Sequence, residues 1–237
     1  MCTSSDPRNQ RSRHGLVVER GDGVLLVDTP PELRQQLLAA DIRRVDAVFV
    51  THLHADHIHG IDDLRIFSLR RNTPLRTYIA REYIEELESR FPYIFDSSLR
   101  LNPETSVPRI DLRAFRAGER IEAAGIELCP LAFPHGHVTS YGFRAGPLGV
   151  VVDGKTIPAE ARQVLDGVEV LVINALWWGN PHPTHFNVEE ALAAARSVGA
   201  ERTYLTHLTH RLDYRDLAAR LPEGFEPAYD GLVVDLA

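Results

Sequence analysis

Cysteine is scarce in this sequence: the 237 residues include only Cys2 and Cys129. Two cysteines cannot form the disulfide framework that stabilises small secreted domains, so we expect a reducing, cytoplasmic location. Long apolar runs are missing too, since none approaches the ~20 residues that span a bilayer. The polar residues 1–11 lack the hydrophobic core of a signal peptide. Both absences predict a protein without a membrane partner.

Positive charge is also in short supply. The 26 Lys and Arg residues face 33 Asp and Glu residues, which gives a formal net charge of −7 at pH 7. Surfaces that bind nucleic acid are usually broadly basic, so this balance disfavours nucleic acid as a partner. Apolar residues make up 44% and charged residues 25%, as in an ordinary globular protein. We expect one α/β domain over residues 1–237.

Short apolar runs separated by turn residues predict the order of the elements. Strands are expected at 15–19, 24–28, 45–50, 75–79, 110–115, 126–133, 139–143, 148–153, 168–173, 202–206 and 232–236, the first two as a hairpin. Helices are expected at 29–38, 61–70, 81–90, 159–165, 188–198 and 214–221, and residues 91–108 as an irregular loop or flap. This order fits an αββα four-layer sandwich, with two mixed β-sheets flanked by helices.

The chemistry is concentrated in Thr51–Gly60, directly after the apolar run 45–50. This stretch holds four histidines and one aspartate, and imidazole and carboxylate groups are preferred ligands of Zn²⁺ that Mn²⁺ also accepts. In extended backbone His52 and His54 face the same side and can bind one ion, while Asp56 and His57 address a second. Two ions ~4 Å apart would form a two-metal hydrolytic site.

Three later strands end on residues that could complete such a site. His135 follows the strand 126–133, Asp153 ends the strand 148–153, and His207 follows the strand 202–206. Taken singly, such a histidine is more often a surface residue and such an aspartate a turn residue. Beside the histidine-rich stretch, they become candidate metal ligands.

These residues resemble the metallo-β-lactamase superfamily, whose signature is similar to Thr51–His57. The stretch 54–65, the pair His135-Gly136, Asp153, Pro183-Thr184-His185, residues 206–210 and the ending 228–232 resemble its phosphoribosyl cyclic phosphodiesterase group. The resemblance implies two divalent ions, Zn²⁺ or Mn²⁺. It implies one ion on His52, His54 and His135, a second on Asp56, His57 and His207, and Asp153 bridging both. It also implies catalytic roles for His185, Asp56 and Asp153, and a supporting role for the carboxylate of Asp28.

The function implied is that of a metal-dependent hydrolase, a phosphodiesterase for a small phosphodiester, cyclic ones included. A hydroxide bridging the metals would attack phosphorus, and His185 would protonate the departing alcohol as general acid. Side chains considered for holding the substrate are His137, His182, Arg65 and Arg211. The alternatives are a lactone, thioester or β-lactam hydrolase, a nuclease for tRNA 3′ ends, and a non-catalytic metal-binding relative. A homodimer is left open.

The sequence departs from that group at its start. The group has a first strand and a Cys-x-Cys-x-x-Cys cluster that, with a later histidine, holds a structural zinc. Here Cys2 resembles the last of those cysteines and His210 the histidine, so we expect no four-ligand zinc from this chain. Either the true start lies upstream of Met1 or the element is lost. Cys129, within an apolar strand, is expected to be a small buried hydrophobe.

Overall fold

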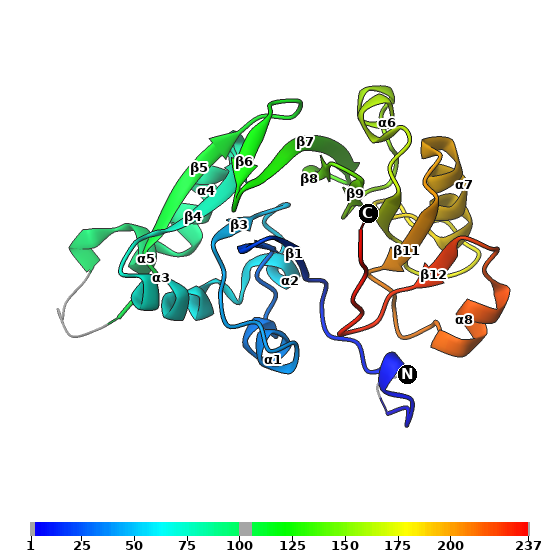
Figure 1. Ribbon diagram of the computed structural model, residues 1–237, viewed down its shortest axis with the longest axis horizontal. Helices are drawn as coiled ribbons and strands as arrows, with labels where there is room; N and C mark the ends of the chain where they lie inside the picture. Colours follow the sequence, from blue (N-terminus) through cyan, green and yellow to red (C-terminus); the bar gives the residue numbers. More distant parts are fainter. Residues whose placement is uncertain (1–2, 100–105, 237) are drawn as a thin grey trace. The chain divides into compact units, whose positions relative to one another are not determined.

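The computed structural model describes residues 3–99 and 106–236. By their contacts the residues divide into two compact units. Figure 1 labels the helices and strands along the chain. We call Arg13–Glu127 the N-terminal unit, and Met1–Ser12 with Leu128–Ala237 the C-terminal unit. That the chain forms one domain stays a prediction.

The N-terminal unit is built on a five-stranded mixed sheet in the order β1-β2-β3-β4-β5. The first two strands form the expected antiparallel hairpin, and β2 to β5 run parallel. Carboxyl ends of parallel strands share one edge of a sheet, so the segments that follow β2 and β3 begin at the same edge. The strands are β1 (Leu16–Arg20), β2 (Gly23–Val27), β3 (Ala47–Phe49), β4 (Leu75–Ala80) and β5 (Ile110–Phe115). The helices are α1 (Leu33–Ala39), α2 (Ala55–Ile58), α3 (Arg65–Arg71), α4 (Ile84–Arg90) and α5 (Pro92–Phe95).

The second sheet has seven strands in the order β12-β11-β10-β9-β8-β7-β6. Strands β7, β8 and β9 alternate in direction, whereas β9, β10, β11 and β12 are parallel. The carboxyl ends of β7, β9, β10 and β11 therefore lie at one edge. The strands are β6 (Ile121–Ala123), β7 (Ile126–His135), β8 (Val138–Ala145), β9 (Leu148–Val151), β10 (Val170–Asn174), β11 (Arg202–Thr206) and β12 (Phe225–Pro227), and the helices are α6 (Ala159–Leu165), α7 (Val188–Val198) and α8 (Tyr214–Arg220).

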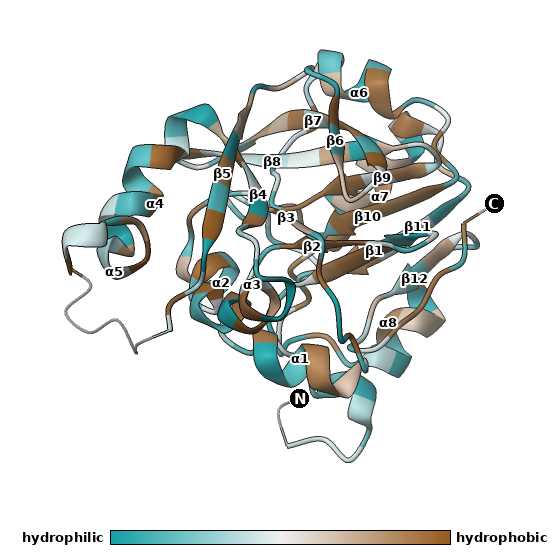
Figure 2. Cartoon of the chain, turned by 60° about the vertical axis from the view of Figure 1, so that its left-hand side comes forward, coloured by the Kyte–Doolittle hydropathy of each residue, from teal (hydrophilic) through white to brown (hydrophobic). Residues whose placement is uncertain are grey.

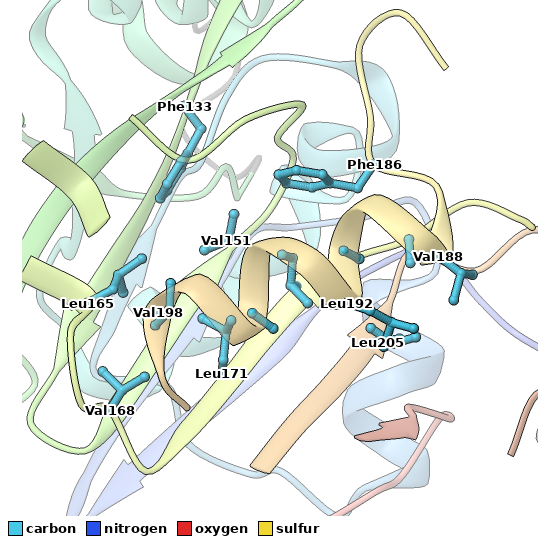
Figure 3. Close-up of a cluster of buried hydrophobic side chains, with 14 of the residues drawn as sticks. Phe133, Val151, Leu165, Val168, Leu171, Phe186, Val188, Leu192, Val198 and Leu205 are labelled. Atoms are coloured by element: carbon cyan, nitrogen blue, oxygen red, sulfur yellow. The ribbon is translucent and has the colours of Figure 1, made fainter. Parts of the chain in front are cut away.

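Helix α7 is the main cover of this second sheet and packs on β10 and β11 (Figure 3). Its buried residues recur at helical spacing: Val188, Ala191, Leu192, Ala195 and Val198. Asn187 and Glu190 form a capping box at its start, and Gly199 ends it in the left-handed conformation. In Figure 2, β10 is coloured as hydrophobic along its length, whereas α4 mixes polar and apolar residues. The buried strands hold the loops at their carboxyl ends on a rigid base.

Most of the expected elements are confirmed, including the strands 110–115 and 202–206 and the helices 159–165 and 188–198. The strand expected at 232–236 is wrong. Those residues are irregular, Val233 is 83% exposed, and the strand beside β11 is Phe225–Pro227. An apolar run cannot show which of two nearby segments pairs with an edge, because pairing depends on partner backbone groups.

Three further expectations need correction. The helix expected over 61–70 begins as a 3-10 turn, Ile61–Leu64, before α3. Residues 91–108 are less irregular than expected, since α5 and a 3-10 turn over Ser97–Leu99 lie there. Residues 100–105 lie outside the described part of the chain. Strand β6, only Ile121–Ala123, was not expected, since three residues are too few for a periodic pattern.

A search of the described residues for membrane spans finds no helix with enough length and apolar character to cross a bilayer.

The start of the chain is fastened to the segment before α8 by polar side chains. Asp6 forms ion pairs with Arg8 at 3.1 Å and with Arg215 at 2.9 Å. Asn9 is buried, donates to the Asp213 carboxylate at 2.7 Å and accepts from the Tyr214 amide at 2.8 Å. Cys2, expected to resemble a zinc ligand, lies outside the described residues, and His210 is exposed. In the described residues this contact between chain start and α8 is made by hydrogen bonds and ion pairs.

Lowering the pH is expected to weaken this attachment through Asp6. Hydrogen bonds from Arg8, followed by one from Arg215, lower the pKa of Asp6 from 3.8 to about 2. Because the pKa is lower in the folded state, the stabilisation is complete above pH 3.8 and is lost as the pH falls through about 2. In urea unfolding, the stability difference between the wild type and Asp6→Asn should shrink over that range. The exposed Asp166 serves as control through Asp166→Asn; a difference for Asp6→Asn that did not change with pH would contradict the prediction.

Candidate metal centre

The carboxylate of Asp28 organises the metal-binding loop of the N-terminal unit. It follows β2 directly, is fully buried, and has a positive φ of 63°. Its Oδ1 accepts from the Thr51 amide at 2.8 Å, and its Oδ2 accepts from the Thr51 hydroxyl at 2.8 Å. His57 Nδ1 lies 2.7 Å from the same Oδ2. The supporting role expected for Asp28 is consistent with these contacts.

These contacts decide where the protons of two histidines lie. An ionised carboxylate only accepts, so His57 Nδ1 carries a proton and donates it to Asp28. The Thr51 hydroxyl gives its own proton to Asp28, and its oxygen therefore accepts from His52 Nδ1 at 3.0 Å. Both histidines thus have Nε2 as the nitrogen with a lone pair. A neutral imidazole held in this way is the form that binds a metal ion.

The four candidate ligands of this unit lie close together. His52 Nε2 is 2.9 Å from His54 Nδ1, and His57 Nε2 is 3.6 Å from Asp56 Oδ2. His54 is the extended residue before α2, and Asp56 and His57 lie within that short helix. Gly60 lets the histidine-rich loop pack against the backbone of Pro30, because a Cβ at position 60 would lie 2.1 Å from the Pro30 carbonyl oxygen.

In the C-terminal unit, three imidazoles surround one carboxylate oxygen. Asp153 Oδ2 lies 3.2 Å from His185 Nε2, 3.3 Å from His207 Nε2 and 3.9 Å from His135 Nε2. The carboxylate of Asp153 and the ring of His135 are almost wholly buried, at 2% and 1% exposed, whereas His185 is 14% and His207 20% exposed. Each of these residues comes from the carboxyl end of a strand or the loop after it: β7, β9, β10 and β11.

The donor atoms fit a divalent metal ion in kind and in spacing. Nitrogen and oxygen ligands about 2.0–2.1 Å from one tetrahedral ion lie about 3.3 Å from one another. The separation of 3.3 Å between His207 and Asp153 matches this value, and those of 2.9 and 3.6 Å in the N-terminal unit lie near it. Ligand atoms of His135, Asp153 and His185 all lie within 4.8 Å of one another. Zn²⁺ and Mn²⁺ both accept these donors.

Two polar residues that the sequence did not single out hold Asp153 and the glycine after it. Ser140 in β8 accepts from the Asp153 amide at 2.8 Å and donates to the Val152 carbonyl at 2.7 Å. The buried Asn174 ends β10, accepts from the Gly154 amide at 2.7 Å and donates to the Gly154 carbonyl at 3.1 Å. A buried serine or asparagine in an otherwise apolar strand is the signal that could have found them, since such groups need partners.

The loop from β10 to α7 brings His185 to this edge of the sheet. The amide of Phe186 donates to the Gly154 carbonyl at 3.0 Å, and the ring of Phe186 is buried in the hydrophobic cluster near the start of α7 (Figure 3). His135 Nδ1 lies 2.9 Å from the carbonyl oxygen of Thr184, which can only accept. His135 therefore presents an unprotonated Nε2, as His52 and His57 do.

The structure brings the seven predicted ligands and the predicted general acid His185 together in two groups. His52, His54, Asp56 and His57 form one within the N-terminal unit, and His135, Asp153, His185 and His207 form the other within the C-terminal unit. That both groups serve the same pair of ions stays a prediction.

The residues considered for substrate binding are more scattered. His182 contacts His185, with ring centroids 5.0 Å apart. Arg211 stacks over the Trp177 ring at 4.6 Å, Arg65 pairs with Asp62, and His137 is exposed. Only His182 is therefore joined to a candidate catalytic residue by a contact of its side chain.

Comparisons with known proteins agree with this geometry. A family model described as "Beta-lactamase superfamily domain" matches residues 24–208. A solved diphosphatase from the PhnP family is 32% identical and has a TM-score of 0.89. The alignment covers 100% of this chain and 89% of that one. The metallo-β-lactamase fold protein YhfI from Bacillus subtilis has a TM-score of 0.73 at 22% identity, covers 93% and 90%, and shows the fold alone.

Two curated sequences are also similar to this chain. Ribonuclease Z from Shouchella clausii is 27% identical over 97% of this chain and 93% of its own length. An octanoyltransferase from Porphyromonas gingivalis is 31% identical over 98% of this chain, but the chain spans only 46% of that protein. The histidine motif, the two mixed sheets with their helices and the family match over residues 24–208 thus agree: the chain belongs to the β-lactamase superfamily and has the metallo-β-lactamase fold.

Proposed function

We propose that this metallo-β-lactamase-fold hydrolase is a metal-dependent phosphodiesterase for a small phosphodiester. The observation that carries the proposal is His185, whose Nε2 lies 3.2 Å from Asp153 Oδ2 and whose ring is 14% exposed. A proton donor is thereby held beside a candidate metal ligand and remains within reach of a substrate. The names of two relatives, a diphosphatase and a ribonuclease, support phosphate rather than carbonyl chemistry.

The proposed ligands divide as the family pattern implies. His52, His54 and His135 would hold one ion, Asp56, His57 and His207 the other, and Asp153 would bridge them. When bound, two such ions neutralise phosphoryl oxygens and lower the pKa of a water ligand towards neutrality. The protein's own part is to orient the ligands, as Asp28 does for His57 and the Thr184 carbonyl does for His135.

His185 is proposed to protonate the departing alcohol. Its Nδ1 is held 2.9 Å from the Thr184 hydroxyl, so its Nε2 is the end that can face a substrate. A positioned acid of this kind contributes typically about 10²–10⁴-fold to a rate. The contact with Asp153 keeps the ring in place.

The substrate is proposed to be small because the chain carries a net charge of −7, which disfavours a long polyanion. The ring of a cyclic phosphodiester would suit a compact site. A cytoplasmic location and a homodimer stay predictions.

A substrate screen separates this function from its alternatives. We expect the purified chain, loaded with Zn²⁺ or Mn²⁺, to hydrolyse bis-p-nitrophenyl phosphate and a small cyclic phosphodiester, and to lose this activity when a chelator is added. A chromogenic lactone, a thioester and a cephalosporin should react far more slowly, and a tRNA precursor should not be cleaved. Hydrolysis of a lactone, thioester or lactam without phosphodiester hydrolysis would contradict the proposal, and so would inactivity on every substrate.

A further inference from the structure

We propose that Thr184 is a positioning residue that orients two histidines of the C-terminal unit by separate groups: its hydroxyl, together with His182, orients His185, and its carbonyl orients His135. The inference rests on the proposed function, because its kinetic consequence concerns proton donation by His185. The contacts themselves lie wholly within the C-terminal unit.

The first step is the protonation state of His182. The backbone amide of Thr184 donates to His182 Nδ1 at 3.3 Å. An amide cannot accept, so this nitrogen of His182 is unprotonated and its proton lies on Nε2. Burial lowers the pKa of His182, and so do the charges of His185 and Lys155. A neutral His182 is consistent with both observations.

The second step follows from the Thr184 hydroxyl. Its oxygen lies 3.2 Å from His182 Nδ1 and 2.9 Å from His185 Nδ1. The lone pair of His182 Nδ1 already accepts from the Thr184 amide, so the hydroxyl donates to the nearer nitrogen, His185 Nδ1. His185 Nε2 lies 3.2 Å from the carboxylate of Asp153, which can only accept. His185 therefore carries its proton on Nε2, the nitrogen that faces Asp153.

The third step separates the hydroxyl of Thr184 from its other groups. The carbonyl accepts from His135 Nδ1 at 2.9 Å and is unaffected by a change of side chain. The methyl group packs on Gly136, where a Cβ would lie 2.8 Å from Thr184 Cγ2 and where φ is +65°. Valine would keep the methyl packing and lose the hydroxyl, whereas serine would keep the hydroxyl and lose the methyl. The two variants therefore form a matched pair.

The consequence for catalysis depends on the leaving group. A nitrophenolate departs without a proton, whereas a phenolate or alkoxide needs one in the transition state. Without the hydroxyl, His185 is free to turn or to change tautomer, so only reactions that need its proton should slow. A wrong tautomer is costly in other enzymes that rely on a positioned histidine.

The inference can be tested without turnover. Nitrogen NMR shifts of the histidine rings in the zinc-loaded full chain report which nitrogen carries the proton. We expect His185 to be protonated on Nε2 in the wild type and in Thr184→Ser, and to show a mixture or the other tautomer in Thr184→Val. The shifts of His135 should be alike in all three proteins. Protonation of His185 on Nδ1 alone in the wild type, or shifts of His185 in Thr184→Val identical to the wild type, would overturn the inference.

Kinetics test the consequence with aryl methyl phosphodiesters that differ in leaving group. For phenol, we expect Thr184→Val to lower kcat by about tenfold or more. For p-nitrophenol as the leaving group, we expect Thr184→Val to lower kcat by less than about threefold, with KM and bound zinc unchanged. The kcat of Thr184→Ser should stay within about threefold of the wild type for both leaving groups. Ser197→Ala, which removes a hydroxyl from the exposed side of α7, is the control.

An equal loss on both leaving groups, or a serine variant as slow as the valine variant, would overturn the positioning role. A wild type that hydrolyses neither ester, yet has the expected NMR tautomers, would instead overturn the proposed function alone.

Discussion

Asp153→Asn is expected to lower kcat for phosphodiester hydrolysis by about a thousandfold or more. The buried carboxylate faces three imidazole nitrogens within 3.9 Å. An amide of the same shape carries no charge and turns either an oxygen or an NH₂ group towards them, so it can neither neutralise a divalent ion nor bridge two. We also expect less zinc per chain, measured by elemental analysis of dialysed protein, alongside the loss of kcat.

The matched control for this prediction is Asp166→Asn, which changes an exposed carboxylate in the same unit. It should leave both kcat and zinc content within about twofold of the wild type, since surface substitutions usually have small effects. Far-ultraviolet circular dichroism should show that both variants are folded. Full zinc binding and an unchanged kcat in Asp153→Asn would exclude this residue from the site.

Asp28→Asn is expected to weaken metal binding by about 10–100-fold. The carboxylate accepts three hydrogen bonds, two from Thr51 and one from His57. An asparagine would turn its NH₂ group towards at least one of these donors. The smallest change that restores a hydrogen bond is a change of the His57 tautomer, which puts a proton on the metal-binding Nε2. We expect a loss of unfolding free energy of about 1–3 kcal/mol as well, because buried donors lose their acceptor. Zinc titration against a competing chelator and urea unfolding measure the two effects.

Asp41 provides an unusually close control. Like Asp28 it has a positive φ, 53° against 63°, but it is exposed. Asparagine tolerates this left-handed backbone region well, so Asp41→Asn tests the backbone effect without the buried hydrogen bonds. Equal metal affinities for the two variants would show that the carboxylate of Asp28 does not orient His57.

The local parts of the fold were the easier ones to predict. The hairpin of β1 and β2, the helix α7 and the strand Arg202–Thr206 all follow from periodicity and turn residues. Strand β12 was missed, and a strand was wrongly expected at 232–236, since an edge strand depends on backbone partners far away in sequence. Periodicity records which side chains prefer burial and carries no information on strand pairing.

The candidate ligands were found because they stand at the ends of apolar strands, and the residues that orient them were not. Ser140 and Asn174 hold Asp153 and Gly154 through hydrogen bonds between strands that are distant in sequence. Thr184 was part of a recognised run, but its three separate contacts to His182, His185 and His135 follow only from coordinates. Hydrogen bonds between residues that are distant in the chain produce no regular sequence spacing from which they could be predicted.

By itself, the sequence was enough to indicate the superfamily, the nitrogen and oxygen donors of the candidate site and a chemistry based on divalent metal ions. It could do so because the chemical type of a ligand depends on the side chain alone, and because the histidine-rich stretch Thr51–Gly60 directly follows an apolar run that reads as a buried strand. The tertiary structure alone decided which nitrogen of each histidine is available. That choice depends on the partner at the other nitrogen: Asp28 for His57, the Thr184 carbonyl for His135 and the Thr184 hydroxyl for His185.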